Sequence, residues 1–306
     1  MARFMVRRIL SGVPVLLGVS LLTFIMIYYL PADPARMYAG PNATAETVAR
    51  IRQQLGLNDP LWTQYGRYLW RALHGDLGFS YNLQMPVLQA IWSRFPYTLQ
   101  LIIGGILVEL LIGIPVGVIS ALRQYSWLDR AGMIIALLGV STPPFWLGLL
   151  LLYWLAFRVP IFPLGGTGGL QHLILPALTA GLGGAAWYAR MTRSSTLEAL
   201  AADYVRTARG KGLGEAAVLL RHILPNALNP VITMAGMDIP WFVGGVVLVE
   251  QVYAWPGIGR MAVVAINEVD IPLIMGTVVF TALLVVLSSI LIDIVQGVLD
   301  PRIRHR

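Results

Sequence analysis

The order of hydrophobic and polar positions divides the chain into long apolar segments and polar connections. Five segments are almost wholly apolar: 9–30, 98–122, 131–157, 231–249 and 272–292. A sixth, 173–189, is weaker and rich in Gly and Ala, the small residues that let packed helices approach closely. A membrane-spanning helix needs about 20 mostly apolar residues. The pattern therefore predicts six membrane-spanning helices and an all-α integral membrane protein.

The first apolar segment is predicted to be a permanent span and not a signal peptide. It holds 22 uncharged residues, about 33 Å of helix at 1.5 Å per residue. A signal peptide has a shorter apolar region and a small-residue cleavage site. This segment ends instead in an aromatic pair, Tyr28–Tyr29, which suits a membrane interface.

The connection at 31–97 carries the signals of short helices. Thr44 can cap one helix, Asp59 before Pro60 can cap a second, and a glycine follows each of these two runs. A third short helix is expected at 87–94. About 65 ordered residues exceed what a connection between two spans needs, so we expect a small external helical domain. Its role is either to dock a molecule outside the membrane or to stiffen the spans as a lid.

Composition strengthens the assignment to the membrane and removes several kinds of chemistry. The chain is 57% apolar and 12% charged, with a mean hydropathy of +0.71, whereas soluble domains carry about 25% charged residues. The absence of cysteine excludes disulfides, thiolate nucleophiles and cysteine-ligated metals. The four histidines show no metal-binding spacing, so no metal site is expected. The net charge is +7, but the positions of the basic residues along the chain are more informative than their sum. No nucleic-acid partner is predicted.

The basic residues assign an orientation. Fourteen Lys and Arg fall in the termini and in the connections at 123–130 and 190–230, and two fall in the short connections on the other side. Basic residues concentrate on the cytoplasmic side, while long external segments translocate largely regardless of charge. Both termini are therefore predicted to be cytoplasmic. The expected organisation is a cytoplasmic N-terminus with the first span at 1–30, the external domain at 31–97, and a five-helix membrane core at 98–306.

Two acids, Glu109 and Asp238, fall inside predicted spans. An acid at a helix centre costs about 2.5–3.5 kcal/mol, which the surrounding aliphatic residues outweigh. These acids either line a transport pathway or gate, or are structural groups that are hydrogen-bonded or protonated within the bundle. The other candidates for a pathway or gate are Ser141, Pro143 and Pro144, where the third span must kink or break, and Glu250, Pro256 and Gly257 after the fifth span.

The cytoplasmic loop at about 190–230 is the most informative stretch. It carries six basic residues, is helix-prone from Ser195 to Arg209, and is then interrupted by glycines at 210, 212 and 214. A second helical run, Glu215 to Leu224, ends at Pro225. Two short helices joined by a glycine turn can move as a rigid lever against a partner protein. The alternative is an ordinary basic loop that packs on lipid headgroups.

The chain shows no nucleotide-binding motif. A phosphate-binding loop requires G-x-x-x-x-G-K-[ST], but Val205 occupies the first glycine position and Gly212 the hydroxyl position. The glycine-rich stretch at 165–171 does not complete G-x-G-x-x-G, because Gln171 stands at the last glycine. Any work driven by a nucleotide must therefore be done by another subunit.

At the cytoplasmic loop the sequence resembles the permease subunits of bacterial ATP-binding-cassette importers. Their shared signature reads E-A-A-x3-G-x9-I-x-L-P. The corresponding positions here are Arg206, Thr207 and Ala208 for E-A-A, Gly212 for the glycine, His222 for the isoleucine and Leu224–Pro225 for L-P. The signature is only partly met, since Arg replaces the Glu and His replaces the Ile. The variant DYVRTARGKGL closely resembles the branch that imports peptides, nickel and glutathione.

Five further segments resemble that branch in order along the chain: LPADP (30–34), HGDLGFSY (74–81), STPPFWLGLLL (141–151), EQVYAWPGIGR (250–260) and LDPRIR (299–304). The long external segment is similar to that of the first-listed, B-type permease of the two that such systems pair. The resemblance implies the six-helix fold of type I importer permeases, with a cytoplasmic coupling helix. The residues it implies for contact with the ATPase are Tyr204, Arg206, Thr207, Ala208, Lys211, Gly212, Leu213, Leu224 and Pro225.

The resemblance also implies a set of partners. An external solute-binding protein delivers a peptide or similar small solute, of the dipeptide, oligopeptide or glutathione class. A second, distinct permease completes the pathway across the bacterial inner membrane. Two cytoplasmic ATPase subunits bind ATP and Mg, so this chain itself is expected to be non-catalytic and without a cofactor.

Two other function classes stay open on the residues alone. Glu109 and Asp238 are compatible with an ion-coupled secondary carrier, although the internal repeat typical of such folds is not found. A membrane-embedded enzyme would need Ser141, Ser194 or Ser195 to find catalytic partners that are distant in sequence.

Overall fold

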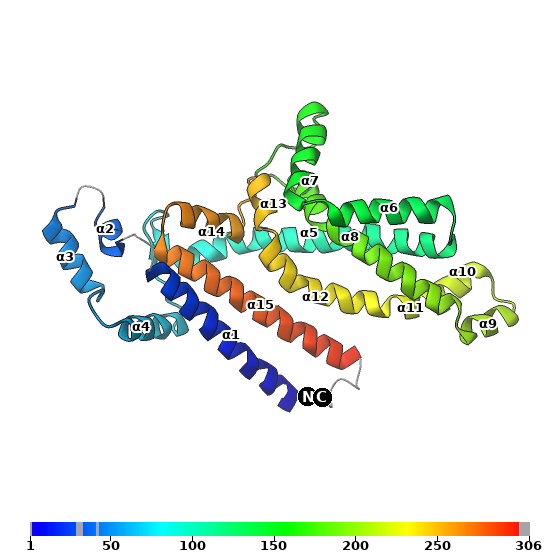
Figure 1. Ribbon diagram of the computed structural model, residues 1–306, viewed down its shortest axis with the longest axis horizontal. Coiled ribbons are helices and arrows are strands. Elements are labelled where there is room, and N and C mark those ends of the chain that lie inside the picture. Colours follow the sequence, from blue (N-terminus) through cyan, green and yellow to red (C-terminus); the bar gives the residue numbers. More distant parts are fainter. Residues whose placement is uncertain (1, 29–32, 41–42, 300–306) are drawn as a thin grey trace. The chain divides into compact units, whose positions relative to one another are not determined.

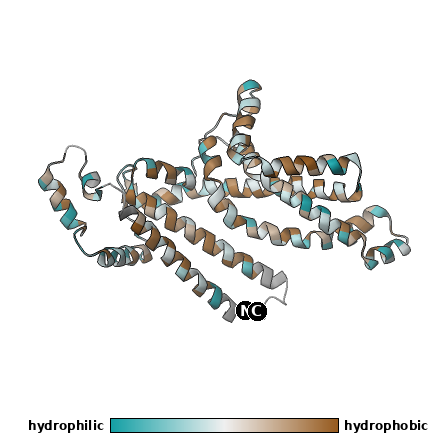
Figure 2. Cartoon of the chain, viewed as in Figure 1, coloured by the Kyte–Doolittle hydropathy of each residue, from teal (hydrophilic) through white to brown (hydrophobic). Residues whose placement is uncertain are grey.

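The computed structural model describes residues 2–28, 33–40 and 43–299, and most of these are helical (Figure 1). The described part contains three helices long and apolar enough to cross a membrane: Arg7–Met26 within α1 (Ala2–Tyr28), α5 (Val87–Leu122), and Ile271–Ile294 within α15 (Ile271–Leu299). Figure 2 shows these helices hydrophobic along most of their length. A bent pair of helices, Trp127–Ser141 and Pro144–Arg158, is a fourth candidate. Three or four candidate spans are thus present by length and composition.

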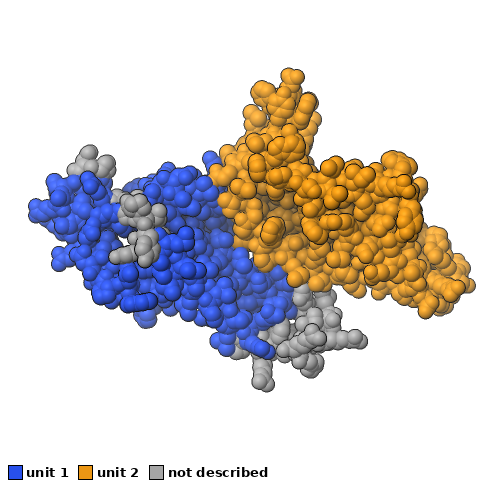
Figure 3. Space-filling view, in the orientation of Figure 1, with its two compact units in different colours: residues 1–96, 257–306 blue, residues 97–256 orange. Residues whose placement is uncertain are grey.

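The chain divides into two compact units, residues 1–96 with 257–306 and residues 97–256 (Figure 3). The long helix α5 contributes to both. Tyr29, part of the LPADP motif and the basic residues after Leu299 lie outside the described residues.

In the first unit, α1 packs along α15, as Figure 1 also shows. Gly12 makes this approach close, because a Cβ at that position would lie 2.6 Å from Val286 Cγ1. Helix α14 (Ile258–Asn267) packs on α15 as well. The hydrophobic core of this region joins the start of α5 to both helices through Val87, Ala90, Ile91, Ile258, Met261, Ala265, Leu273, Ile274 and Phe280.

The part of this unit predicted to be external contains α2 (Pro34–Ala39), α3 (Ala45–Gln54), α4 (Leu61–Leu73) and a short hairpin, β1 (Phe79–Ser80) with β2 (Met85–Pro86). The expected cap at Thr44 is confirmed, since its side chain accepts a hydrogen bond from the Thr47 N–H at 3.3 Å. The hairpin is tied to α15 by the buried Asp270. This carboxylate accepts hydrogen bonds from Ser80 Oγ at 2.5 Å and from the Leu273 N–H at 3.2 Å.

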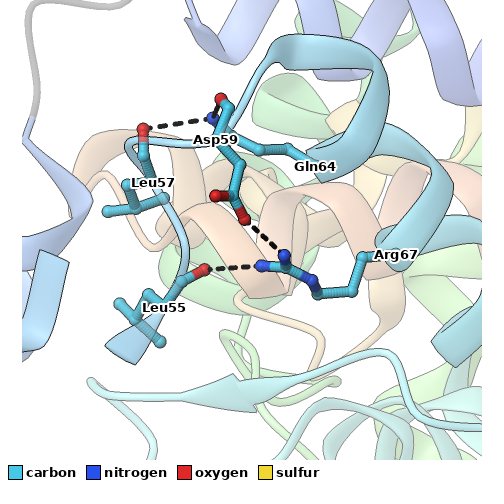
Figure 4. Close-up of polar contacts among 5 residues, drawn as sticks. All are labelled: Leu55, Leu57, Asp59, Gln64 and Arg67. Atoms are coloured by element: carbon cyan, nitrogen blue, oxygen red, sulfur yellow. Dashed lines mark hydrogen bonds and ion pairs between the residues drawn. The ribbon is translucent and has the colours of Figure 1, made fainter. Parts of the chain in front are cut away.

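The predicted cap at Asp59 is wrong. Pro60 takes the N-cap position of α4, and no side chain caps that helix. The Asp59 carboxylate instead accepts a hydrogen bond from Arg67 at 2.5 Å, while Arg67 also donates to the Leu55 carbonyl at 3.2 Å (Figure 4). A charge-assisted hydrogen bond is stronger than a neutral one. The carboxylate therefore joins the loop between α3 and α4 to the helix that it was expected to cap.

The predicted third external helix is not separate. Residues 87–94 form the first turns of α5, which continues through Pro96 to Leu122. Proline removes one backbone hydrogen bond. Burial of Val87, Ala90 and Ile91 in the core of the first unit supports the helix on the N-terminal side of that proline, so it does not end there.

The second unit is built around α8 (Leu170–Leu200), which packs against α6 (Trp127–Ser141), α7 (Pro144–Leu151) and α12 (Asn229–Gly245). Around them lie the π-helix η1 (Leu152–Arg158), α9 (Asp203–Gly210), α10 (Glu215–Val218), the π-helix η2 (Leu219–Ile223), α11 (Leu224–Ala227) and α13 (Val247–Val252). Gly113 of α5 and Gly181 of α8 permit backbone contact, because a Cβ on either would lie within 2.7 Å of a carbonyl oxygen of the other helix.

The expected break at Pro143–Pro144 is present and larger than a kink. Helix α6 ends at Ser141, Pro143 is the N-cap of α7 and Pro144 its first residue. The two helical axes are bent by 107°. Two successive residues without N–H groups cannot continue the hydrogen-bond ladder of α6, and Pro144 is well suited to begin a new helix.

Candidate functional site

The loop predicted at about 190–230 to contact the ATPase begins inside α8, which continues to Leu200. The sequence predicts one helix from Ser195 to Arg209, and this is wrong at residues 201–202, where the chain turns before α9. The turn allows α9 to fold back so that Val205 and Ala208 are buried. They share a small hydrophobic core with Ala199, Val218, Ile223 and Ala227, from α8, α10, η2 and α11. This core fixes α9 to the end of α8.

The C-terminus of α9 is closed by a Schellman motif. The Leu213 N–H bonds the Ala208 carbonyl at 3.4 Å, and the Gly212 N–H bonds the Arg209 carbonyl at 2.9 Å. Gly212 has φ = +77°, the left-handed conformation that this motif requires and that glycine adopts without strain. A Cβ at Gly212 would meet no heavy atom within 4 Å. The glycine is therefore required by backbone conformation, and its surface is open.

The face of α9 opposite the core is exposed. Tyr204 is 40% exposed and Leu213 37%, and Arg206, Thr207 and Lys211 are exposed as well. A hollow of about 270 Å³ adjoins this face, lined by Leu200, Ala201, Ala202, Asp203, Arg206 and Arg209. The segment thus presents aromatic, aliphatic and cationic groups on a short, well-anchored helix. Of the residues predicted for ATPase contact, Ala208 does not lie on this face, because it is buried in the core. Leu224 and Pro225 belong to α11.

An ion pair stabilises the turn between α9 and α10. Arg209 donates two hydrogen bonds to the Glu215 carboxylate, at 2.8 and 3.0 Å. The hydrogen bonds from Arg209 lower the pKa of Glu215 below its ordinary value. Arg209 and Glu215 were not singled out as a pair in the sequence, although their spacing of six residues across three glycines brackets the turn.

The sequence predicts that the second helical run ends at Pro225, and this prediction is wrong. The chain stays helical from Glu215 through α10, η2 and α11 to Ala227, with Pro225 in the first turn of α11. Proline cannot donate to the carbonyl four residues before it, and the π-helical turn at 219–223 widens the backbone just upstream. Leu224 is half-buried and Pro225 is exposed beside this core.

Glu109 and Asp238, the two acids inside predicted spans, lie in one cluster. Tyr188 of α8 donates a hydrogen bond from its hydroxyl to the Asp238 carboxylate on α12. Asp238 and Tyr188 both interact electrostatically with Glu109 on α5. Glu109 is 4% exposed and packs on the backbone of Gly184, where a Cβ would lie 1.6 Å from Glu109 Oε1. Tyr188 was missed in the sequence, although it lies one helical turn from Gly184 on the same face.

The other gate candidates have structural partners. Glu250 is fully buried and accepts a hydrogen bond from Thr98 Oγ1 at 2.7 Å. Pro256 lies between helices α13 and α14. The neighbouring Trp255 is 2% exposed and donates from Nε1 to the Tyr97 carbonyl at 2.9 Å. Gly257 is the N-cap of α14. Ser141 is the last residue of α6, and its side chain is exposed.

One buried ion pair was not anticipated. Arg193 of α8 binds both carboxylate oxygens of Asp129 on α6, at 2.7 and 2.8 Å. Asp129 also accepts from the Tyr125 N–H at 2.9 Å. Within the described residues, no group of three His, Cys, Asp or Glu side chains is placed to hold a metal ion.

Comparison with known proteins identifies the class. Residues 113–305 match the family described as binding-protein-dependent transport system inner membrane component, and residues 1–102 match the N-terminal region described for such membrane components. The chain belongs to this family: it is a permease of an ATP-binding-cassette importer and a multi-pass inner-membrane protein.

The relatives cover the chain from end to end. It is 40% identical over 306 residues to the glutathione transport system permease protein GsiC of Salmonella paratyphi A, with all of both chains covered. It is 42% identical over 313 residues, again with all of both chains covered, to a putative peptide transport system permease protein of Brucella abortus. A glutathione transport system permease protein of Escherichia coli is 40% identical over 306 residues and is likewise covered completely.

Proposed function

We propose that this permease forms, with a second and distinct permease, the pathway for peptides or a similar small solute of the dipeptide, oligopeptide or glutathione class. The names of relatives that match the whole chain support this solute class. An external solute-binding protein delivers the solute, and two cytoplasmic ATPase subunits bind ATP and Mg and drive transport. This chain supplies no catalytic group and no cofactor.

The observation that carries the proposal is the construction of α9. Its buried side, Val205 and Ala208, is fixed to α8 and α11, and its C-terminus is closed by Gly212. Its other side is exposed and carries Tyr204, Thr207 and Lys211. A short helix held rigidly on one face and open on the other can transmit a push from a partner, which a flexible loop cannot.

The proposed arrangement has six spans with both termini in the cytoplasm. Beyond the three or four candidates defined by length, α8 and the α12–α13 pair complete the count. The external domain at 31–97 docks the solute-binding protein. The hydrogen bonds that Asp270 accepts from Ser80 and from the Asn82 N–H of the hairpin support a firm connection between that domain and α15.

Cross-linking tests the proposal directly, because the chain contains no cysteine. We expect Thr207→Cys to cross-link to an ATPase subunit in the assembled importer. Trp62→Cys, on the exposed face of α4 and 78% exposed, serves as the matched control and should not cross-link there. A membrane-impermeant maleimide added from outside whole cells should label Trp62→Cys and leave Thr207→Cys unlabelled. Labelling of Thr207→Cys from outside, or solute uptake without any ATPase subunit, contradicts the proposal.

A further inference from the structure

The cluster of Glu109, Tyr188 and Asp238 contains an acceptor that the protein leaves unused. Glu109 is buried, with 4% of the residue exposed. Its Oε1 lies against the backbone of Gly184, and its Oε2 is buried without a hydrogen-bond partner among the described residues. A buried acceptor that makes no hydrogen bond is unfavourable, so this oxygen points to a donor supplied from elsewhere.

The surroundings favour a cationic donor. Asp238, a second acid, interacts electrostatically with Glu109, and two neighbouring carboxylates favour a positive charge between them. Among the described residues, no Lys, Arg or His forms an ion pair with either acid. On α8, Arg193 pairs with Asp129, and the Arg190 guanidinium lies over the ring of Trp187, while its buried Nε has no hydrogen-bond partner among the described residues.

The cluster borders the exposed side of α12. Asp238 is half-buried, and Met237 beside it is 62% exposed. Trp241 follows Asp238 by three residues and is 77% exposed, but its indole Nε1 lies 3.8 Å from the Cβ position of Gly245, on the next turn of the helix. The two carboxylates are therefore the groups that can bind an ammonium ion here, through charge-assisted hydrogen bonds.

We infer that Glu109 and Asp238, with Tyr188 orienting Asp238, form a binding site for the primary ammonium group of the transported solute. For a peptide this is the α-amino group. The inference rests on the proposed function, since it places the solute at this cluster. Gly184 is part of the site because only a residue without Cβ leaves room for the Glu109 carboxyl group.

Binding to the purified importer, without the solute-binding protein, tests the inference. The probes are radiolabelled alanyl-alanine and its N-acetyl form, which lacks the ammonium group. We expect the wild type to bind alanyl-alanine at least about tenfold more tightly, a difference of about 1.4 kcal/mol. Glu109→Gln and Asp238→Asn should each remove most of this preference. Glu268→Gln, which neutralises an exposed carboxylate outside the cluster, should keep it.

The outcomes separate this inference from the proposed function. Equal binding of the two probes by the wild type, no measurable binding of either, or an unchanged preference in both acid variants overturns the ammonium site. ATP-driven uptake is measured in parallel with the complete system. If uptake is normal while the preference is absent, only the site is wrong, whereas loss of ATP-driven uptake in the wild type rejects the proposed function. Asp238→Asn retains an oxygen that can accept the hydrogen bond from the Tyr188 hydroxyl. This variant therefore tests the effect of the charge on ammonium binding even if the importer that carries Glu109→Gln does not assemble.

Discussion

Gly212 offers the sharpest test of the rigid coupling helix. Its φ of +77° lies in the left-handed region, where a residue with a Cβ is destabilised by about 1–2 kcal/mol. Apart from the glycine and its two chain neighbours, no heavy atom of the described residues lies within 4 Å of the position of that Cβ, so the cost is conformational and not a steric clash. A change of 1–2 kcal/mol alters a local equilibrium by about 5–30-fold. Gly212→Val should therefore open the end of α9 without unfolding the membrane core.

The assay is the number of solute molecules transported per ATP hydrolysed in reconstituted vesicles. Gly212→Val should lower this ratio several-fold while the protein level in the membrane stays normal, and Gly212→Asn should retain more, because Asn tolerates the left-handed region better. Gly210→Ala is the control: that position is also open but is not among the glycines with positive φ. Normal coupling in Gly212→Val, or an equal loss in Gly210→Ala, would refute the conformational argument.

Two further predictions concern ion pairs in the same unit. Arg193→Gln leaves the Asp129 side chain, which is 5% exposed, without its partner and should destabilise the detergent-solubilised protein by about 3–5 kcal/mol. In a double-mutant cycle of thermal unfolding, adding Asp129→Asn should recover much of this loss. Simple additivity of the two changes in unfolding free energy would contradict the pairing. Glu215 has a lowered pKa, so its contact with Arg209 should persist as the pH falls to the ordinary pKa of Glu, about 4.3, and be lost only as the pH falls through the lowered value. A spin label at Ala216→Cys should become mobile only in that lower range, and Glu215→Gln should abolish the transition.

Local signals in the sequence predicted the elements that depend on local interactions. The Thr44 cap and the break at Pro143–Pro144 follow from a side chain and a ring that act on their own backbone. The long apolar helices α1, α5 and α15 follow from hydropathy alone. Each of these features needs no contact with a distant part of the chain, and so it can be read from a short window.

The errors occurred where distant contacts decide the boundaries of helices. The separate helix expected at 87–94 merges into α5 because its apolar residues meet α14 and α15, more than 150 residues away in sequence. The turn at 201–202 exists because Val205 and Ala208 bury against η2 and α11. The sequence predicted that Asp59 caps the backbone of the next helix, because the pattern did not show that Arg67 binds its carboxylate instead.

The candidate site was predictable to the same extent. Basic residues and glycines indicated the segment proposed to couple to the ATPase. They did not predict the Schellman motif, which requires glycine at position 212. The acids Glu109 and Asp238 were identified as exceptional by their position inside spans. Their association through Tyr188 could not be predicted, because it requires the packing of α5, α8 and α12.

Helix α8 connects the two candidate sites mechanically. Ala199, near its end, belongs to the core that holds α9, and Tyr188 lies eleven residues earlier, about 16 Å along the axis at 1.5 Å per residue. Between them Arg193 ties α8 to α6. Since α8 is helical without a break from Leu170 to Leu200, it has no hinge between the two sites that could absorb a displacement. Under the proposed function, a push on α9 therefore acts on the bond between Tyr188 and Asp238, the contact that joins α8 to α12 at the proposed ammonium site.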